Sequence, residues 1–162
     1  MSTRGASFDL PSRTAAGLEI SKLRVRDLMT EEVVAMTADD SLAALRDLMY
    51  DRDVRHMPVV DRDRELVGLV TKRDLLRDSL IEQRDVPDFV EEVILEHRCV
   101  GELMTTAVES IEPDADIGEA ARIMFDNKFG CLPVVEGQRL VGILTDADFV
   151  RLFASGAEAR SD

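Results

Sequence analysis

The stretch GLVTKRDLL at residues 68–76 returns later in the chain as GILTDADFV at residues 142–150. In both stretches a short apolar run, of the kind found in buried strands, ends at a Thr, and an Asp follows three positions later. A Thr at a helix N-cap accepts a hydrogen bond from the amide at N3, and an acidic residue there favours the positive end of the helix. The pattern predicts a strand that leads directly into a helix at Thr71 and again at Thr145.

The repeat extends well beyond these two stretches. Residues 25–60 align with residues 100–135 without a gap, and 11 of the 36 aligned positions are identical, including the Leu-Met-Thr and Pro-Val-Val blocks. Self-similarity at a fixed period is the signature of a duplicated structural unit. The chain therefore contains two copies of one unit, with a period of about 75 residues.

Each copy has the same predicted order of elements: strand, helix, strand, strand, helix. A short strand at residues 33–36 or 108–111 precedes an amphipathic helix with apolar residues at helical spacing. Two further strands follow, HMPVV and LVGLV in copy one and CLPVV and LVGIL in copy two, separated by a short polar link that suits a hairpin. The prediction is an α/β fold, in the wider α+β sense, with two β-α-β-β-α units.

Polar residues mark the start of the first helix in each copy. Ser41 and Asp116 stand at the expected N-cap positions, and Asp116 with Glu119 fits a capping box. Between the copies, residues 88–97 follow Pro87 and have the periodicity of a connecting helix. We divide the chain into a flexible N-terminal segment (1–20), a first unit (21–80), a connecting segment (81–99), a second unit (100–154) and a C-terminal tail (155–162).

The composition limits the class of protein. The formal net charge is -13 and is spread along the chain, so we expect no sequence-independent binding to nucleic acid or to an anionic membrane. No apolar run approaches the roughly 18 residues of a membrane span, and no secretory signal is present. Cys99 and Cys131 are the only cysteines and form no CxxC pair. These features predict a soluble cytoplasmic protein whose partners are small molecules or other proteins.

The motifs of common enzymes are absent from the sequence. There is no GxxxxGK[ST] phosphate loop, no GxGxxG, no HExxH and no GxSxG, and no nucleophile has a base at a suitable spacing. His97 and Cys99 lie close together but lack the further ligands of a zinc site. We therefore predict no catalytic residue, no metal site and no obligatory cofactor.

The two copies resemble CBS domains, and their tandem arrangement resembles a CBS pair, also called a Bateman module. The resemblance rests on Leu-Met-Thr, a helix, Pro-Val-Val, Leu-Val-Gly and Thr-x-x-Asp, which occur in this order in both copies and cover about residues 21–153. It implies pseudo-twofold symmetry, with small three-stranded sheets facing each other and helices outside. It also implies two clefts that bind adenosine derivatives such as AMP, ADP, ATP or S-adenosylmethionine, and a further pairing into homodimers.

The same resemblance assigns candidate ligand-binding residues. The Thr and Asp of the repeated motif match residues that contact the phosphates and the ribose in nucleotide-binding CBS domains. The adenine pocket of the family corresponds to the Leu-Met-Thr block and to residues around the Pro of Pro-Val-Val. The candidate ligand-binding residues are Thr71, Asp74, Thr145, Asp148, Thr30, Thr105, Arg55, His56, Met57, Pro58, Gly130, Cys131, Leu132 and Pro133.

The copies differ in charge near the expected phosphates. Lys72 and Arg73 follow the Thr of copy one, whereas Asp146 and Ala147 follow the Thr of copy two. We hypothesise two unequal clefts: one that prefers anionic nucleotides, and one that is empty or takes an uncharged or cationic nucleoside.

The predicted function is regulatory. Binding of an adenine nucleotide would change the shape of the module, and we expect a separate effector protein to respond. A second interpretation stays open, in which Thr-x-x-Asp is only a helix cap and the chain is a ligand-free dimerisation or scaffold module.

Overall fold

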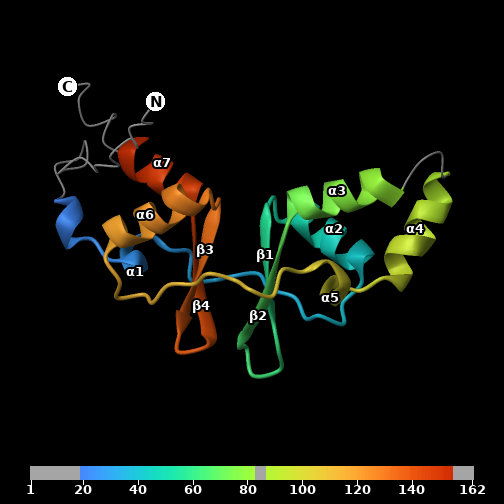
Figure 1. The fold of residues 1–162 in the computed structure, drawn as a ribbon, viewed down its shortest axis with the longest axis horizontal. Helices are drawn as coiled ribbons and strands as arrows, with labels where there is room; N and C mark the ends of the chain where they lie inside the picture. The colour runs from blue at the N-terminus through green and yellow to red at the C-terminus, as the bar shows by residue number, and fades with distance from the viewer. Residues whose placement is uncertain (1–18, 83–86, 155–162) are drawn as a thin grey trace, which may run out of the picture. The chain divides into compact units, whose positions relative to one another are not determined.

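The computed structural model describes residues 19–82 and 87–154. The predicted C-terminal tail, and all but the last two residues of the predicted N-terminal segment, lie outside the described residues. The chain divides into two compact units, whose elements are labelled in Figure 1. Unit 1 consists of the described parts of Met1–Glu31, Ser110–Val134 and Val141–Asp162, and unit 2 consists of Glu32–Glu109 and Val135–Leu140.

Unit 2 contains the first hairpin and four helices. Strands β1 and β2 pair antiparallel, with His56 opposite Thr71 and Val59 opposite Gly68, so the predicted hairpin is confirmed. Helix α3 follows β2 without a loop, as the Thr-x-x-Asp pattern predicts. The elements are α2 (Leu42–Asp51), β1 (His56–Val60), β2 (Leu66–Thr71), α3 (Lys72–Glu82), α4 (Asp88–His97) and α5 (Val100–Leu103).

Unit 1 contains most of the second hairpin and has a similar arrangement of elements around it. Helix α7 begins directly after Thr145, again as predicted. The elements are the short 3-10 helix η1 (Ile20–Lys22), α1 (Val25–Leu28), α6 (Ile117–Asn127), β3 (Cys131–Glu136), β4 (Arg139–Thr145) and α7 (Asp146–Ala154). The predicted α+β fold is confirmed.

The first predicted strand of each copy is much shorter than expected. Residues 33–36 and 108–111 form no strand; only Met36 and Ile111 pair, each through one parallel bridge to the hairpin, so each sheet has two strands and not three. Met36 N–H donates to Pro58 C=O at 3.1 Å, and Val60 N–H donates to Met36 C=O at 2.8 Å. The next bond of a parallel ladder would need the N–H of Pro58, which proline lacks. Pro133 stops the second ladder in the same way.

The hydrophobic core of each unit contains residues from both sequence copies. Val100 of copy two is fully buried among Leu42 and Met57 of copy one. Val25 of copy one is fully buried in the core of copy two, around Leu132. The segment before each Leu-Met-Thr block therefore packs on the other copy. The bounds 21–80 and 100–154 describe the repeat in the sequence and stay a prediction.

The predicted helix starts are present, with one difference. The Ser41 hydroxyl accepts a hydrogen bond from Ala44 N–H at 3.0 Å, as expected of an N-cap. The Asp116 carboxylate accepts from Gly118 N–H at 2.7 Å, at position N2 and not from Glu119 at N3. Asp116 is thus the predicted N-cap of α6, but its hydrogen bond is not that of a capping box.

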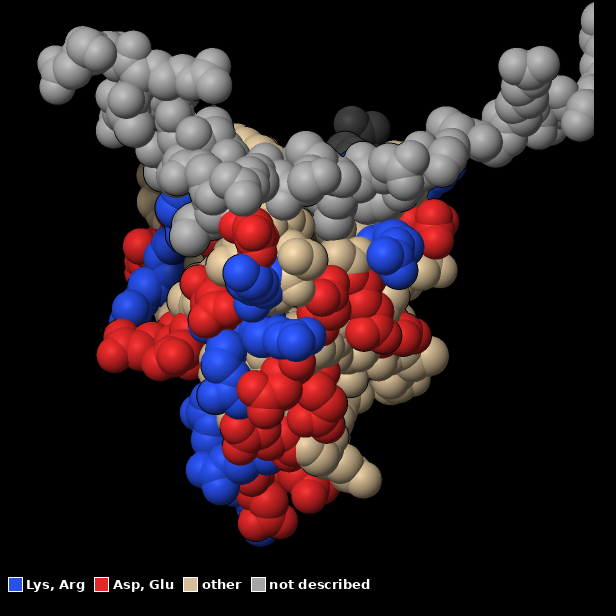
Figure 2. All heavy atoms as spheres, turned by 90° about the vertical axis from the view of Figure 1, so that its left-hand side faces the viewer, with Lys and Arg blue, Asp and Glu red and all other residues tan. Residues whose placement is uncertain are grey.

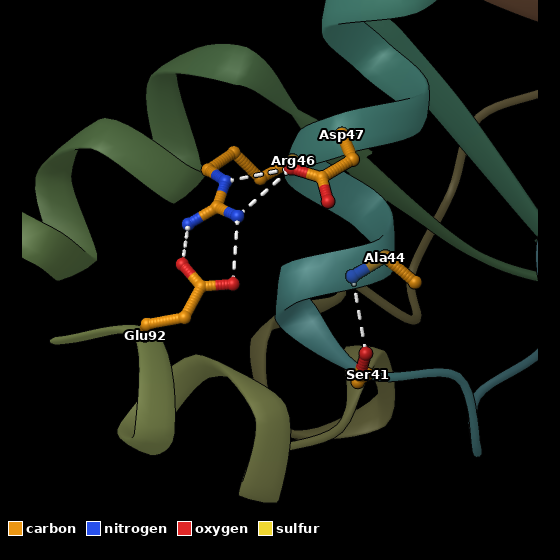
Figure 3. A network of polar contacts seen from close by, with 5 residues as sticks. All are labelled: Ser41, Ala44, Arg46, Asp47 and Glu92. Carbon is orange, nitrogen blue, oxygen red and sulfur yellow. Dashed lines mark hydrogen bonds and ion pairs between the residues drawn. The ribbon is translucent and has the colours of Figure 1, made fainter. Parts of the chain in front are cut away.

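The predicted connecting helix is confirmed as α4, and an ion pair holds it against α2. Figure 3 shows the Arg46 guanidinium facing the Glu92 carboxylate, with N···O distances of 2.8 and 3.1 Å. Arg46 Nε also donates to Asp47 at 2.9 Å. The hydrogen bond from Arg46 lowers the pKa of Glu92. The bidentate geometry restricts how α4 can lie against α2.

Among residues 19–82 and 87–154, no helix is long and apolar enough to cross a membrane. On the face drawn in Figure 2, acidic and basic side chains lie directly beside one another. Both signs of charge are therefore present on that face.

Candidate functional site

The first candidate site surrounds Asp74 at the start of α3. The Asp74 Oδ2 atom accepts two hydrogen bonds from Thr71, from N–H at 2.8 Å and from Oγ1 at 2.7 Å. Thr71 Oγ1 in turn accepts from Asp74 N–H at 3.2 Å. Strand β2 ends at Thr71, so these bonds fix the turn between strand and helix. Among the described residues, Asp74 Oδ1 has no hydrogen-bond partner.

The second candidate site surrounds Asp148 at the start of α7. Asp148 Oδ2 accepts from Thr145 N–H at 2.7 Å and from Thr145 Oγ1 at 3.0 Å. Asp148 Oδ1 accepts from Arg151 Nη1 at 3.2 Å. The Asp148 side chain is only 3% exposed, whereas Asp74 is half-buried. The two sites therefore share the Thr–Asp contact and differ in the second carboxylate oxygen.

Each site also includes the Thr of a Leu-Met-Thr block, from the other copy. Thr105 of copy two pairs with Leu69, two residues before Thr71, through bonds of 2.9 and 3.0 Å. Thr30 of copy one pairs in the same way with Ile143, two residues before Thr145. Both Thr side chains are exposed. The structure thus brings Thr105 close to Thr71, and Thr30 close to Thr145.

A glycine in each hairpin makes this pairing possible. A Cβ atom placed on Gly68 would lie 2.5 Å from Met104 Sδ, and one on Gly142 would lie 2.5 Å from Met29 Sδ. The Met of each Leu-Met-Thr block therefore packs over the Gly of the Leu-Val-Gly block that precedes the Thr-x-x-Asp motif. The sequence shows both blocks twice, but this contact was not predicted.

The basic residues of copy one gather at the Asp74 site. Lys72 N–H donates to Arg55 C=O at 2.8 Å, and His56 lies opposite Thr71 in the hairpin. The side chains of Arg55, Lys72 and Arg73 are exposed and form no ion pair with another described residue. The first turn of α3 is thus a basic surface beside a carboxylate.

The equivalent positions at the Asp148 site are not basic. Asp146 N–H donates to Gly130 C=O at 3.1 Å, which puts an acidic side chain where the other site has Lys72. Cys131 is buried, and burial, with a smaller contribution from the Asp146 charge, raises the pKa of its thiol to about 12. The thiol is therefore protonated at neutral pH and is a poor nucleophile.

Besides Cys131, four of the predicted ligand-binding residues are core residues in this structure. Met57 and Leu132 are 0% exposed and belong to the two hydrophobic clusters. Pro58 and Pro133 are also buried. None of the four offers exposed side-chain surface to a ligand.

A third Thr-x-x-Asp sequence shows that the motif alone does not define a site. Asp40 Oδ2 accepts from Thr37 N–H at 2.7 Å and from Thr37 Oγ1 at 3.1 Å. The contact is the same as at Thr71 and Thr145, yet it closes a turn before α2 and has no Leu-Met-Thr threonine bridged to the strand before it. The sequence prediction overlooked this occurrence.

No group of three or more His, Cys, Asp or Glu side chains within the described ranges could hold a metal ion. Cys99 and Cys131 are both free.

Comparison with known proteins identifies the repeated unit. The family model for the CBS domain matches residues 25–80 and again residues 100–155. The chain belongs to the CBS domain family. The two matches correspond to the two copies in the sequence, so the protein carries a tandem pair of CBS domains.

Solved CBS-domain structures share the fold. AcuB from Vibrio cholerae is 34% identical, with a TM-score of 0.72, and the match covers 86% of this chain and 98% of AcuB. The protein CBSX2, whose crystal structure is described as a complex with AMP, is 29% identical, with a TM-score of 0.68, and the match covers 85% of this chain and 98% of CBSX2.

Some relatives with CBS domains are much longer. An uncharacterized protein of Methanocaldococcus jannaschii is 29% identical over 150 residues, which are 91% of this chain but only 36% of that protein. The CBS pair is therefore one part of such proteins. The activity of the whole relative does not follow from this match.

Proposed function

We propose that this CBS pair is a regulatory module that binds an adenosine nucleotide, with the ribose on Asp74. The observation that carries the proposal is the carboxylate of Asp74, which holds the turn through Oδ2 and keeps Oδ1 without a partner among the described residues. An ionised carboxylate offers about four lone-pair sites. Two of them remain at Asp74, one for each hydroxyl of a ribose. The AMP complex of CBSX2 supports the choice of ligand class.

The basic surface beside Asp74 favours an anionic nucleotide. Arg55, Lys72 and Arg73 have no carboxylate partner among the described residues, so a phosphate need not displace one. The first turn of α3 adds the positive end of the helix. AMP, ADP and ATP all carry the required charge, and the additional phosphates of ATP would gain most from three cations.

A chain of contacts connects the Asp74 site with the segment that carries Thr105. Arg98 Nη1 donates to Asp78 of α3 at 2.7 Å, and Arg98 Nε donates to Glu102 of α5 at 3.0 Å. Both charges of the first pair are largely buried, at 23% and 16% exposed. A ligand that moves α3 would therefore also move α5, and we propose this as the route by which the bound state reaches an effector protein or a second copy of the chain. We place the module in the cytoplasm, in keeping with its two free cysteines.

A specific observation also favours a second function, that of a ligand-free scaffold. Thr71 and Asp74 form a complete helix cap between themselves, and Thr37 with Asp40 forms the same contact away from either site. In a scaffold the motif would stabilise the start of α3 and nothing more. The two functions differ in whether the Asp74 carboxylate binds a ligand.

Thermal unfolding with AMP, ATP and S-adenosylmethionine tests the proposal. A ligand that binds only the native state raises the free energy of unfolding by about 2.7 kcal/mol at a hundredfold excess over Kd. The variant Asp74→Asn keeps an oxygen that can accept the cap hydrogen bonds and loses the charge. The matched control is Asp40→Asn, which makes the same change in the third Thr-x-x-Asp turn.

We expect AMP or ATP to stabilise the wild type and Asp40→Asn, and not Asp74→Asn. If no nucleotide stabilises the folded wild type, the scaffold is the correct function. An equal stabilisation of Asp74→Asn would place the ligand away from Asp74.

A further inference from the structure

The Asp74 and Asp148 carboxylates differ in how many lone pairs they keep. In both, Oδ2 accepts two hydrogen bonds from the preceding Thr, which uses both of its lone pairs. Asp148 Oδ1 also accepts from Arg151 Nη1 at 3.2 Å, whereas Asp74 Oδ1 has no partner among the described residues. Asp74 therefore keeps two lone pairs and Asp148 keeps one.

The sequence positions of the two arginines do not explain why only one of the carboxylates is paired. Arg77 stands three residues after Asp74, as Arg151 stands three residues after Asp148. Arg77 is exposed and forms no ion pair with any described residue. The first turns of the helices explain the contrast: Lys72 and Arg73 begin α3 and repel a third cation. Helix α7 instead has two acidic residues in its first turn, which attract Arg151.

We propose that Arg151 keeps the Asp148 site closed to ribose, so that the module binds one nucleoside per chain, at Asp74. The inference rests on the proposed function and adds which of the two sites works. The two vicinal hydroxyls of a ribose need two acceptor positions on one carboxylate, and Asp148 has only one left. The Asp148 side chain is also only 3% exposed, while that of Arg151 is 72% exposed and lies on the solvent side of the pair.

The charge of the Asp148 site decides which ligand it would take once Arg151 is removed. Asp146 stands where the other site has Lys72, and Ala147 where it has Arg73. A phosphate would meet a carboxylate there and no compensating cation from these positions. The opened site should therefore take an uncharged nucleoside and discriminate against its phosphates. Adenosine is the suitable probe for the Asp148 site, and AMP for the Asp74 site.

Isothermal titration calorimetry with adenosine and with AMP tests this inference. The variant Arg151→Met keeps an apolar stem of similar length and removes every hydrogen-bond donor. Arg77→Met makes the same change at the equivalent position of α3, where no ion pair with a described residue is lost, and is the matched control. A double variant, Arg151→Met with Asp148→Asn, locates any new binding.

We expect one adenosine per chain for the wild type and for Arg77→Met, and two for Arg151→Met. The affinity of the second site should rise roughly tenfold or more, the factor that corresponds to one hydrogen bond to a charged group. The double variant should return to one adenosine per chain, and AMP should bind once in every case.

Three results would overturn the inference. Two equal adenosine sites in the wild type would mean that Arg151 does not close the Asp148 site. One site in both the wild type and a folded Arg151→Met would mean that something else closes it. A single site that is lost in Asp148→Asn and kept in Asp74→Asn would reverse the assignment. After either of the first two results the proposed function survives. The third would also move the ribose of the proposed function away from Asp74, and failure of every protein to bind either probe would refute nucleotide binding itself.

Discussion

The substitution Gly68→Ala should destabilise the protein because it places a methyl group against Met104. The added Cβ would lie 2.5 Å from Met104 Sδ, 3.0 Å from Cγ and 3.2 Å from Cβ. All three distances are shorter than an ordinary van der Waals contact of about 3.5 Å between heavy atoms. The Met104 side chain must therefore shift to make room for the added methyl group.

Two opposing effects determine how much Gly68→Ala lowers the free energy of unfolding. Overpacking of this kind costs about 1 to 3 kcal/mol. Replacing Gly by Ala inside a strand recovers roughly 0.5 to 1 kcal/mol, because Gly loses more conformational entropy on folding. The net loss should lie between about 0 and 2.5 kcal/mol and centre on roughly 1 kcal/mol, which corresponds to a decrease in Tm of roughly 2 to 4 °C for a chain of this size.

A double-mutant cycle with Met104→Ala measures the contact itself. Shortening Met104 removes the obstacle, so Gly68→Ala should cost roughly 1 kcal/mol less in that background than in the wild type. Gly137→Ala is the control: Gly137 has a positive φ of 65° and no atom within 4 Å of an added Cβ, so its cost should not depend on Met104. Strictly additive effects of Gly68→Ala and Met104→Ala in urea unfolding would refute the pairing of Leu-Met-Thr with Leu-Val-Gly.

Three further predictions concern charges and the buried thiol. Because Arg46 lowers the pKa of Glu92 in the folded state, the pair stabilises the protein above the ordinary carboxyl pKa and loses its effect as pH falls through the lowered value. Urea unfolding should thus show Glu92→Gln less stable than the wild type at pH 7, with a difference that decreases as pH falls below the ordinary carboxyl pKa; a difference that does not change with pH would contradict the ion pair. Burial raises the pKa of Cys131 to about 12, so iodoacetamide at pH 8 should leave Cys131 unmodified in the native protein and alkylate it in urea, as read by mass spectrometry; rapid native labelling would contradict this. The double variant Arg55→Ala with His56→Ala should bind adenosine as the wild type does and ATP about fivefold more weakly in calorimetry, since an exposed charge pair such as Arg55 with a phosphate contributes up to about 1 kcal/mol. Unchanged ATP binding would exclude a role for these two side chains.

Most of the local structure could be predicted from residue patterns. The repeated Thr-x-x-Asp placed the starts of α3 and α7, and the apolar periodicity after Pro87 placed α4. These elements depend on hydrogen bonds and contacts between residues a few positions apart, which a sequence displays directly. The overestimated first strands could have been corrected from the same sequence, since Pro58 has no N–H to continue the ladder.

The candidate sites were predicted less completely. The sequence identified Asp74 and Asp148 as equivalent residues with different charged neighbours. It did not predict that Arg151 bonds to Asp148 while Arg77 stays apart from Asp74, because side chains of the same spacing can take either position. It also did not show that Met57 and Leu132 are fully buried, since an apolar residue before a strand suits a core as well as a ligand pocket.

The sequence by itself determined the duplication, the order of elements in each copy and the caps that begin the helices. Only the tertiary structure decided how the copies exchange segments, so that Thr105 pairs with Leu69 and Thr30 pairs with Ile143. Both copies carry the same Leu-Met-Thr and Leu-Val-Gly blocks, so pairing within a copy and pairing between copies look alike in the sequence. The choice depends on which hydrophobic core buries Val25 and Val100, and that burial exists only once the two copies have folded together.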